Sequence, residues 1–199
     1  MAISADQVKA LRDATGAGMM DSKRALEATN GDLEKAKDWL RQKGMAKAGT
    51  KAARTAREGI IATYVHHNHQ LGVLLELNSE SDFVARNDEF RHLAHEIAVH
   101  IAAVEPRYLR REDVPKDVLD RERAIFEAQA KDQKKPDNVV EKIVQGKLSD
   151  FYKREVLMDQ AWAKDDKRTV DQVVKAAIAK LGENITISRF ARFKVGEAS

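Results

Sequence analysis

Apolar residues recur at helical spacing in three short runs within residues 4–43. Ser4 and Asp32 stand just before the first and third runs, where a side-chain oxygen can cap a helix. Turns that contain glycine separate the runs, because glycine adopts backbone angles that end a helix. The pattern predicts a small three-helix domain over residues 1–44.

Residues 45–58 have no apolar stripe and consist of small residues with regularly spaced lysine and arginine. This composition predicts a basic linker rich in alanine and glycine, part of which can be helical. Basic side chains could contact RNA phosphates, but solvated charge is the ordinary state of a linker. We therefore expect no direct binding of nucleic acid.

The pattern of β-rich runs and helical spacing in residues 59–199 predicts one larger core domain. Three β-rich runs predict the strands of an antiparallel sheet: residues 60–65, 71–78 and 185–195. Apolar residues at helical spacing predict flanking helices over residues 90–104 and 170–181. A three-stranded antiparallel sheet packed with helices belongs to the α+β class.

Two charged helical patterns follow Pro115 and meet near residues 133–137, where lysine, proline and aspartate predict a turn. They predict an antiparallel helical hairpin over about residues 115–150. Residues 151–165 show no clear pattern, and we assign no structure to them.

The segment Glu76–Asn87 joins the second predicted strand to the helix that follows. It is polar apart from Phe83 and Val84. A side-chain oxygen of Ser81 or Asp82 can cap a first helical turn here.

Phe83 has two interpretations. It lies seven residues before Phe90, so one continuous helix would direct both rings to the core. Its polar neighbours indicate instead an aromatic ring at the surface. On the residues alone we favour the core.

Met19 and Met20 follow the first glycine turn and are also ambiguous. One methionine can close the small helical core, and Met20 is the better candidate for that position. Two adjacent methionines beside a turn also suit a surface that adapts to a partner protein. The residues alone leave both interpretations open.

The amino-acid composition excludes several classes of protein. The formal net charge is +3, with 34% charged and 43% hydrophobic residues, which is typical of a globular protein rich in surface helix. There is no cysteine, which excludes disulfides and thiolate chemistry. No apolar run approaches the ~20 residues of a membrane helix, and the amino terminus lacks the features of a signal peptide. We expect a cytoplasmic protein without membrane contact.

Candidate metal and catalytic residues are few. His66, His67 and His69 could bind a metal, but no neighbouring carboxylate or cysteine completes a zinc set. We favour ordinary hairpin residues there, and surface or boundary positions for the three histidines of the following helix: His92, His95 and His100. With no nucleophile and base in view, we expect no catalytic residues and no covalent chemistry.

The segment Thr15–Gly18 contains two glycines, as phosphate-binding loops do. It lacks the Gly-Lys-Ser/Thr ending and a preceding strand, so we interpret it as a turn between helices. We expect no bound nucleotide or other cofactor.

Two long motifs, Leu11–Leu26 and Glu76–Asn87, resemble the two signatures of the elongation factor Ts family. Ser81 stands where that family usually has threonine, and the resemblance covers nearly the whole chain. It implies an amino-terminal domain of the ubiquitin-associated type and a protruding helical hairpin. It also implies a guanine nucleotide exchange factor for the translational GTPase elongation factor Tu.

The resemblance further implies which residues touch the partner. Asp82 and Phe83 would enter elongation factor Tu near its magnesium and phosphate site, with Ser81 and Val84 beside them. These four are called the wedge residues below. This implication reverses the core interpretation of Phe83.

In the amino-terminal domain the resemblance assigns partner contacts to four residues: Arg12, Met19, Met20 and Lys23. Long family members carry two copies of the core and a further carboxy-terminal helix, whereas this chain has one copy. The resemblance therefore implies a homodimer built through the core domain. The alternative function is a ubiquitin-associated-type adaptor on a dimerising core, without exchange activity.

Overall fold

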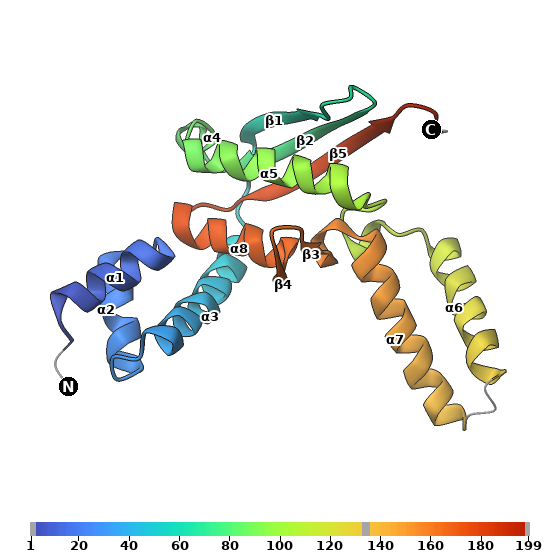
Figure 1. The fold of residues 1–199 in the computed structure, drawn as a ribbon, viewed down its shortest axis with the longest axis horizontal. Helices are drawn as coiled ribbons and strands as arrows, with labels where there is room; N and C mark the ends of the chain where they lie inside the picture. Colours follow the sequence, from blue (N-terminus) through green and yellow to red (C-terminus); the bar gives the residue numbers. More distant parts are fainter. Residues whose placement is uncertain (1–2, 133–135, 198–199) are drawn as a thin grey trace. The chain divides into compact units, whose positions relative to one another are not determined.

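The computed structural model describes residues 3–132 and 136–197. Three helices precede the first strand, and further helices flank a sheet of three strands (Figure 1). The predicted α+β class is thereby confirmed. Residue contacts divide the chain into two compact units. Unit 1 consists of Met1–Ile60, Leu77–Leu93 and Gln172–Thr186, and unit 2 of Ile61–Glu76, Ala94–Asp171 and Ile187–Ser199.

The three amino-terminal helices of unit 1 are α1 (Ala5–Thr15), α2 (Met19–Ala28) and α3 (Leu33–Lys51). Ser4 forms a reciprocal capping box with Gln7 at the start of α1. At the start of α3, the Asp32 carboxylate accepts a hydrogen bond of 3.0 Å from the backbone N–H of Lys35. This bond holds the pKa of Asp32 below its usual value. Both predicted caps are confirmed, and the helices bury one apolar cluster: Val8, Leu11, Ala25, Leu26 and Ala36.

Helix α3 continues through residues 45–51, the first half of the predicted linker. Ala48 in this extension is buried, and the Lys51 ammonium donates a hydrogen bond of 2.5 Å to the carbonyl of Gly182. Contacts within unit 1 therefore support a helical segment that has no apolar stripe of its own. The predicted boundary between two domains stays a prediction.

The sheet has the strand order β1-β2-β5 and is antiparallel, with β1 (Glu58–Val65), β2 (Leu71–Ser79) and β5 (Thr186–Lys194). On β2 the side chains alternate, so that Leu74 is exposed between the buried Val73 and Leu75. The two helices predicted over residues 90–104 and 170–181 are α5 (Asp88–Val104) and α8 (Val170–Leu181). Helical spacing indicated six apolar residues of α5, of which Leu93 is half-buried and five are buried: Phe90, Ala94, Ile97, Ala98 and Ile101.

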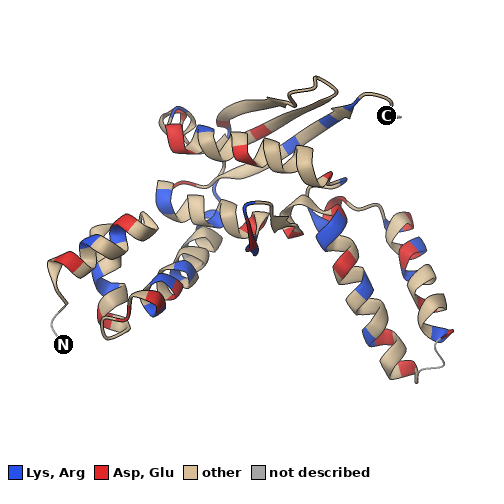
Figure 2. Cartoon of the chain, viewed as in Figure 1, with Lys and Arg blue, Asp and Glu red and all other residues tan. Residues whose placement is uncertain are grey.

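Helices α6 (Lys116–Lys131) and α7 (Asp137–Glu155) lie side by side in unit 2 (Figure 1). They enclose a small apolar cluster of Ala130, Val140 and Val144. Charged residues of both signs are spread along both helices (Figure 2). The predicted helical hairpin is confirmed, while residues 133–135 of its predicted turn lie outside the described residues.

Residues 151–165, for which the sequence showed no pattern, contain the end of α7, two short elements and the start of a third. Helix α7 ends at Glu155, and a 3₁₀ turn, η2 (Leu157–Asp159), follows. Strand β3 (Ala161–Trp162) then pairs antiparallel with β4 (Asp165–Thr169). Strand β4 reads Asp-Asp-Lys-Arg-Thr, so its polar sequence carries no β signal of its own.

His100 on α5 is buried, and the expectation that it lies at the surface or boundary is wrong. Its ring stacks on Trp162 with 5.1 Å between centroids. Nδ1 accepts a hydrogen bond of 3.2 Å from the N–H of Ala163, so Nε2 carries the proton and donates to the side-chain oxygen of Gln160 at 3.0 Å. Burial lowers the pKa of His100, and the bond to Gln160 opposes this only partly.

The free energy of unfolding is expected to fall as the pH drops below about 6.5, the ordinary histidine value. In that range the unfolded chain takes up a proton that the folded, buried His100 resists. Stability is therefore fully present above this pH and declines below it. Urea melts at about pH 7.5 and pH 5.5 measure the effect. The His100→Gln chain should lose less stability over the same interval, and an equal loss in both chains would contradict the prediction.

Candidate functional site

The chain leaves β2 through a single helical turn, α4 (Asp82–Ala85), before α5 begins. The hydroxyl of Ser81 accepts a hydrogen bond of 3.4 Å from the N–H of Val84, so Ser81 is the cap of α4. At the start of α5, the side-chain oxygen of Asn87 accepts a bond of 2.8 Å from the N–H of Glu89. The two caps separate α4 from α5, and the segment is not one continuous helix.

This break determines where Phe83 lies. Its side chain is 85% exposed, whereas Phe90 is fully buried. The core interpretation of Phe83, which the residues alone favoured, is therefore wrong. Asp82 beside it pairs with Arg86 at 3.0 Å across one helical turn. The segment presents an uncovered phenyl ring next to a carboxylate, a combination suited to contact with another protein.

The methionines at the start of α2 are both exposed, Met19 at 59% and Met20 at 60%. The interpretation of Met20 as a core residue is wrong, because the buried residues of α2 are Ser22, Ala25 and Leu26. Arg12 and Lys23 are exposed as well. All four candidate residues of the amino-terminal domain are thus accessible to a partner.

A lysine of α8 contacts both the turn before α2 and the start of α5. Gly16 in that turn has a left-handed φ of +68°, and a Cβ built on it would lie 2.6 Å from Cε of Lys180. The ammonium of Lys180 pairs with the carboxylate of Glu89. Within unit 1, the two candidate regions therefore adjoin one side chain of α8.

The model of the elongation factor Ts family matches residues 48–197 of the chain. An elongation factor Ts of Thermosipho melanesiensis is 54% identical over 195 residues, which cover 98% of this chain and 100% of that protein. Those of Thermotoga maritima and Geobacter sulfurreducens are 53% and 50% identical over 197 residues, which cover 99% of this chain and 98% and 91% of the relatives. The chain belongs to the elongation factor Ts family.

Membership of the elongation factor Ts family makes the chain a translation elongation factor by kind. The resemblance carried by Leu11–Leu26 and Glu76–Asn87 is confirmed. The relatives also cover the amino-terminal helices, which lie ahead of the family match. In the part of the chain that the structure describes, no helix has the length and apolarity needed to cross a membrane.

Two residues after α8, Glu183 and Asn184, contact the candidate site and have no signal in the sequence. The Glu183 carboxylate accepts hydrogen bonds from the N–H of Ser81 at 3.0 Å and from its hydroxyl at 2.6 Å. The carboxylate of Glu80 accepts a bond of 2.6 Å from the N–H of Asn184. These partners lie more than a hundred positions apart in the chain, so no local pattern could reveal them.

Two segments have residue types that occur in metal or phosphate sites: His66–His69 and Thr15–Gly18. No group of three His, Cys, Asp or Glu side chains that could hold a metal occurs among residues 3–132 and 136–197. His66 is hydrogen-bonded to the Tyr64 hydroxyl at 2.8 Å, and its ring lies 4.2 Å from that of His67. Gly16 ends α1 in a left-handed conformation, so Thr15–Gly18 is a turn between helices, as predicted.

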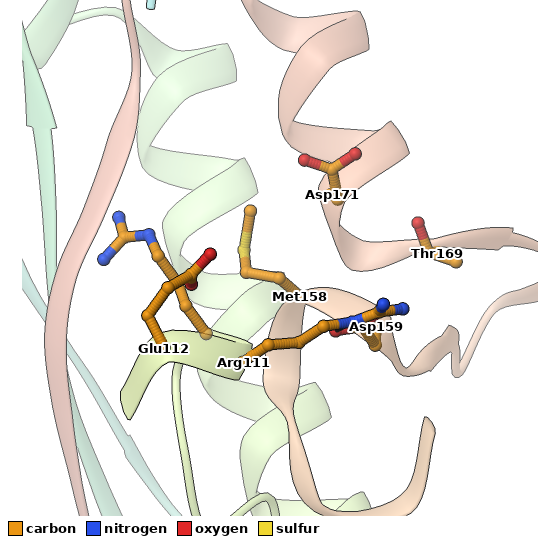
Figure 3. Close-up of a pocket in the computed structure, with 7 residues that line it drawn as sticks. Arg111, Glu112, Met158, Asp159, Thr169 and Asp171 are labelled. Atoms are coloured by element: carbon orange, nitrogen blue, oxygen red, sulfur yellow. Dashed lines mark hydrogen bonds and ion pairs between the residues drawn. The ribbon is translucent and has the colours of Figure 1, made fainter. Parts of the chain in front are cut away.

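A hollow of about 290 Å³ lies within unit 2, lined by seven residues: Arg110, Arg111, Glu112, Met158, Asp159, Thr169 and Asp171. Arg111 reaches across it to Asp159 (Figure 3), with two hydrogen bonds of 3.0 Å from Nε to the carboxylate oxygens. The bond from Asp159 raises the pKa of Arg111. These two charges satisfy each other within the hollow.

Proposed function

We propose that this chain is a guanine nucleotide exchange factor that binds elongation factor Tu with bound GDP and promotes GDP release. In this proposal Asp82 and Phe83 enter the GTPase near its magnesium and phosphate site. Ser81 and Val84 contact the partner beside them. The chain needs no cofactor and performs no covalent chemistry, because it only changes how tightly its partner holds a nucleotide.

The observation that carries the proposal is the exposure of Phe83. The ring of Phe83 stands in the capped helical turn α4 and is poorly covered by its own chain. Burial of that ring in a partner releases ordered water and is favourable, so the ring can hold a displaced element of the partner in place. The family membership supports the identity of that partner.

Phe83 alone cannot supply the whole effect. Weakening GDP binding a thousandfold requires about 4 kcal/mol of coupling between the two ligands of the GTPase. Burial of one phenylalanine contributes roughly 1.5–3 kcal/mol, and part of that is spent in deforming the partner. A wider interface is needed, and the exposed Met19 and Met20 on α2 are available for it.

Release of fluorescent GDP from purified elongation factor Tu tests the proposal. The chain should accelerate release in proportion to its concentration until elongation factor Tu is saturated. Binding without acceleration would favour the alternative function, an adaptor without exchange activity. The absence of both binding and acceleration would refute the proposed partner.

The Met19→Ala/Met20→Ala chain is expected to bind elongation factor Tu about thirtyfold to a thousandfold more weakly. Each exposed methionine contributes about 1–2 kcal/mol when a partner covers it. GDP release at saturating concentration should largely survive, because the wedge residues are intact. Affinity is measured by titration after circular dichroism has confirmed the helical content. Ile125→Ala, an exposed apolar residue on α6, is the matched control. Normal binding by the folded double variant would contradict the prediction.

The exposed face of the sheet supports a homodimer, which we also propose. Ile61 and Val65 on β1, Leu74 on β2 and Phe193 on β5 are between 47% and 66% exposed. Leu74 points away from the buried Val73 and Leu75, so it lies on the face opposite the core. An exposed apolar surface on several strands is typical of protein–protein contact. A second copy of the chain would cover it with an identical surface.

Light scattering of the full chain is expected to give twice the mass of 22.3 kDa. Leu74→Glu should shift the mass towards one chain, because it places a charge in the centre of the proposed contact. Ile125→Glu introduces the same charge on the helical hairpin and should leave the mass unchanged. A single-chain mass at every concentration of the unaltered protein would rule out the homodimer.

A further inference from the structure

The turn that ends α8 binds the residues directly before the wedge. Gly182 has a left-handed φ of +84°, which stops the helix and turns the next two residues towards Glu80 and Ser81. Glu183 is half-buried and Asn184 is buried, so neither side chain is free in solvent. All of these residues belong to unit 1.

Glu183 holds Ser81 at two points. One carboxylate oxygen accepts the backbone N–H at 3.0 Å, and the other accepts the hydroxyl proton at 2.6 Å. Hydrogen bonds to an ionised carboxylate are about twice as strong as those between neutral groups, and a pair of them fixes orientation as well as distance. The carbonyl of Ser81 accepts a third bond, of 2.9 Å, from the hydroxyl of the buried Ser79. The backbone of Ser81 is therefore held on both sides.

The bond to Glu183 also determines how Ser81 caps α4. A hydroxyl has one proton to donate. When Ser81 donates it to Glu183, the lone pairs of the oxygen remain for the N–H of Val84, at 3.4 Å. The carboxylate thus orients the oxygen that begins the turn on which Asp82 and Phe83 stand.

The same turn is tied to the chain that leaves α3. The Asn184 side-chain amide donates a hydrogen bond of 2.6 Å to the carbonyl of Arg54. The Arg54 guanidinium lies 3.6 Å from the Glu80 carboxylate oxygen that accepts the Asn184 N–H. Residues from three separate segments of unit 1 therefore meet at Glu183 and Asn184.

We propose that Glu183 is a positioning residue for nucleotide exchange, which acts on Asp82 and Phe83 through Ser81. This inference rests on the proposed function. Phe83 has little packing of its own, so the cap beneath it determines its place. A partner element displaced by the ring pushes back on it. The two hydrogen bonds that Glu183 accepts from Ser81 keep α4 from rotating away from the partner. Glu183 needs no contact with the partner for this role.

The Glu183→Ala chain is expected to lower the maximum rate of GDP release from elongation factor Tu by about tenfold. The concentration at half-maximal rate should change by less than about threefold, because the contact residues remain. Glu183→Gln can keep only one of the two acceptor oxygens and should lose less. The double variant Ser81→Ala/Glu183→Ala should be less impaired than the two single effects combined, since each single variant already removes the bond between the Ser81 hydroxyl and Glu183.

Amide hydrogen exchange of the free chain gives a second measurement that needs no partner. The N–H groups of Ser81 and Val84 should exchange faster in Glu183→Ala, while those in the middle of α5 keep their protection. Glu34→Ala removes an exposed carboxylate that pairs only locally with Lys37, and it should change neither measurement. If Glu183→Ala does not fold, Glu183→Gln replaces it in both measurements.

The outcomes separate the two proposals. If the unaltered chain does not accelerate GDP release, the proposed function fails, and the protection of Ser81 alone decides whether Glu183 positions the turn. If the unaltered chain is active and Glu183→Ala keeps its maximum rate, the positioning role is wrong, whatever happens to the protection. Unchanged protection at Ser81 in a folded Glu183→Ala chain would also overturn it.

Discussion

Replacement of Phe83 by alanine is expected to slow GDP release from elongation factor Tu about tenfold to a hundredfold. In the proposed complex the ring is buried by the partner, which contributes roughly 1.5–3 kcal/mol and holds the displaced element in place. The free chain should change in stability by less than about 1 kcal/mol, because the 85% exposed ring packs on almost nothing. A large functional effect without a stability effect is the signature of a contact residue.

GDP-release rates and denaturant melts on the same preparation of Phe83→Ala test this prediction. Asp82→Ala should act in the same direction and more weakly, since its carboxylate already pairs with Arg86 in the free chain. Ile125→Ala removes another exposed apolar side chain and should leave the rate unchanged. Unimpaired release by folded Phe83→Ala would remove the observation on which the proposed function depends.

Replacement of Phe90 by alanine is expected to lower the free energy of unfolding by about 3–5 kcal/mol. Phe90 is fully buried on α5, so its truncation removes packed surface and leaves a cavity. The fraction of Phe90→Ala that remains folded should still accelerate GDP release, because the caps at Ser81 and Asn87 do not depend on the ring.

Denaturant midpoints of Phe83→Ala and Phe90→Ala, measured side by side, test the contrast between the two rings. The same substitution is made seven positions apart, in one segment of one unit, so the difference reports burial alone. Similar midpoints for both variants would mean that the two rings do not differ in burial as the structure shows. The midpoints can be compared as stabilities when both variants have the same denaturant slope, m, as the unaltered chain.

Much of the secondary structure could be predicted from the sequence. The caps at Ser4, Asp32 and Ser81 involve side chains and N–H groups three residues apart, and the structure contains each of them. The buried stripe of α5 follows from helical spacing alone. Strand β4 could not be predicted, because its polar residues form a strand only by pairing with β3.

The site was predicted less completely. The residues alone favour the core for Phe83 and leave Met20 open between core and surface, and the structure places both at the surface. The family resemblance implies partner contacts for Met19, Met20 and Phe83, which the structure shows to be exposed, and these contacts stay a proposal. Glu183 went unnoticed, because an acidic residue after a glycine at the end of a helix has no distinctive pattern.

The sequence by itself determined the caps, the periodic helices, the three strands and the family to which the chain belongs. These features depend on residues within a few positions of one another, or on long motifs that are defined by the order of residues alone. Only the tertiary structure decided that His100 is buried under Trp162, that α3 continues to Lys51, and that Glu183 holds Ser81. Each of these depends on which distant segment covers a side chain or supplies its hydrogen-bond partner. The packing of the whole chain determines these contacts. Burial and pairing contribute to the free energy of folding only when the distant segments are in contact.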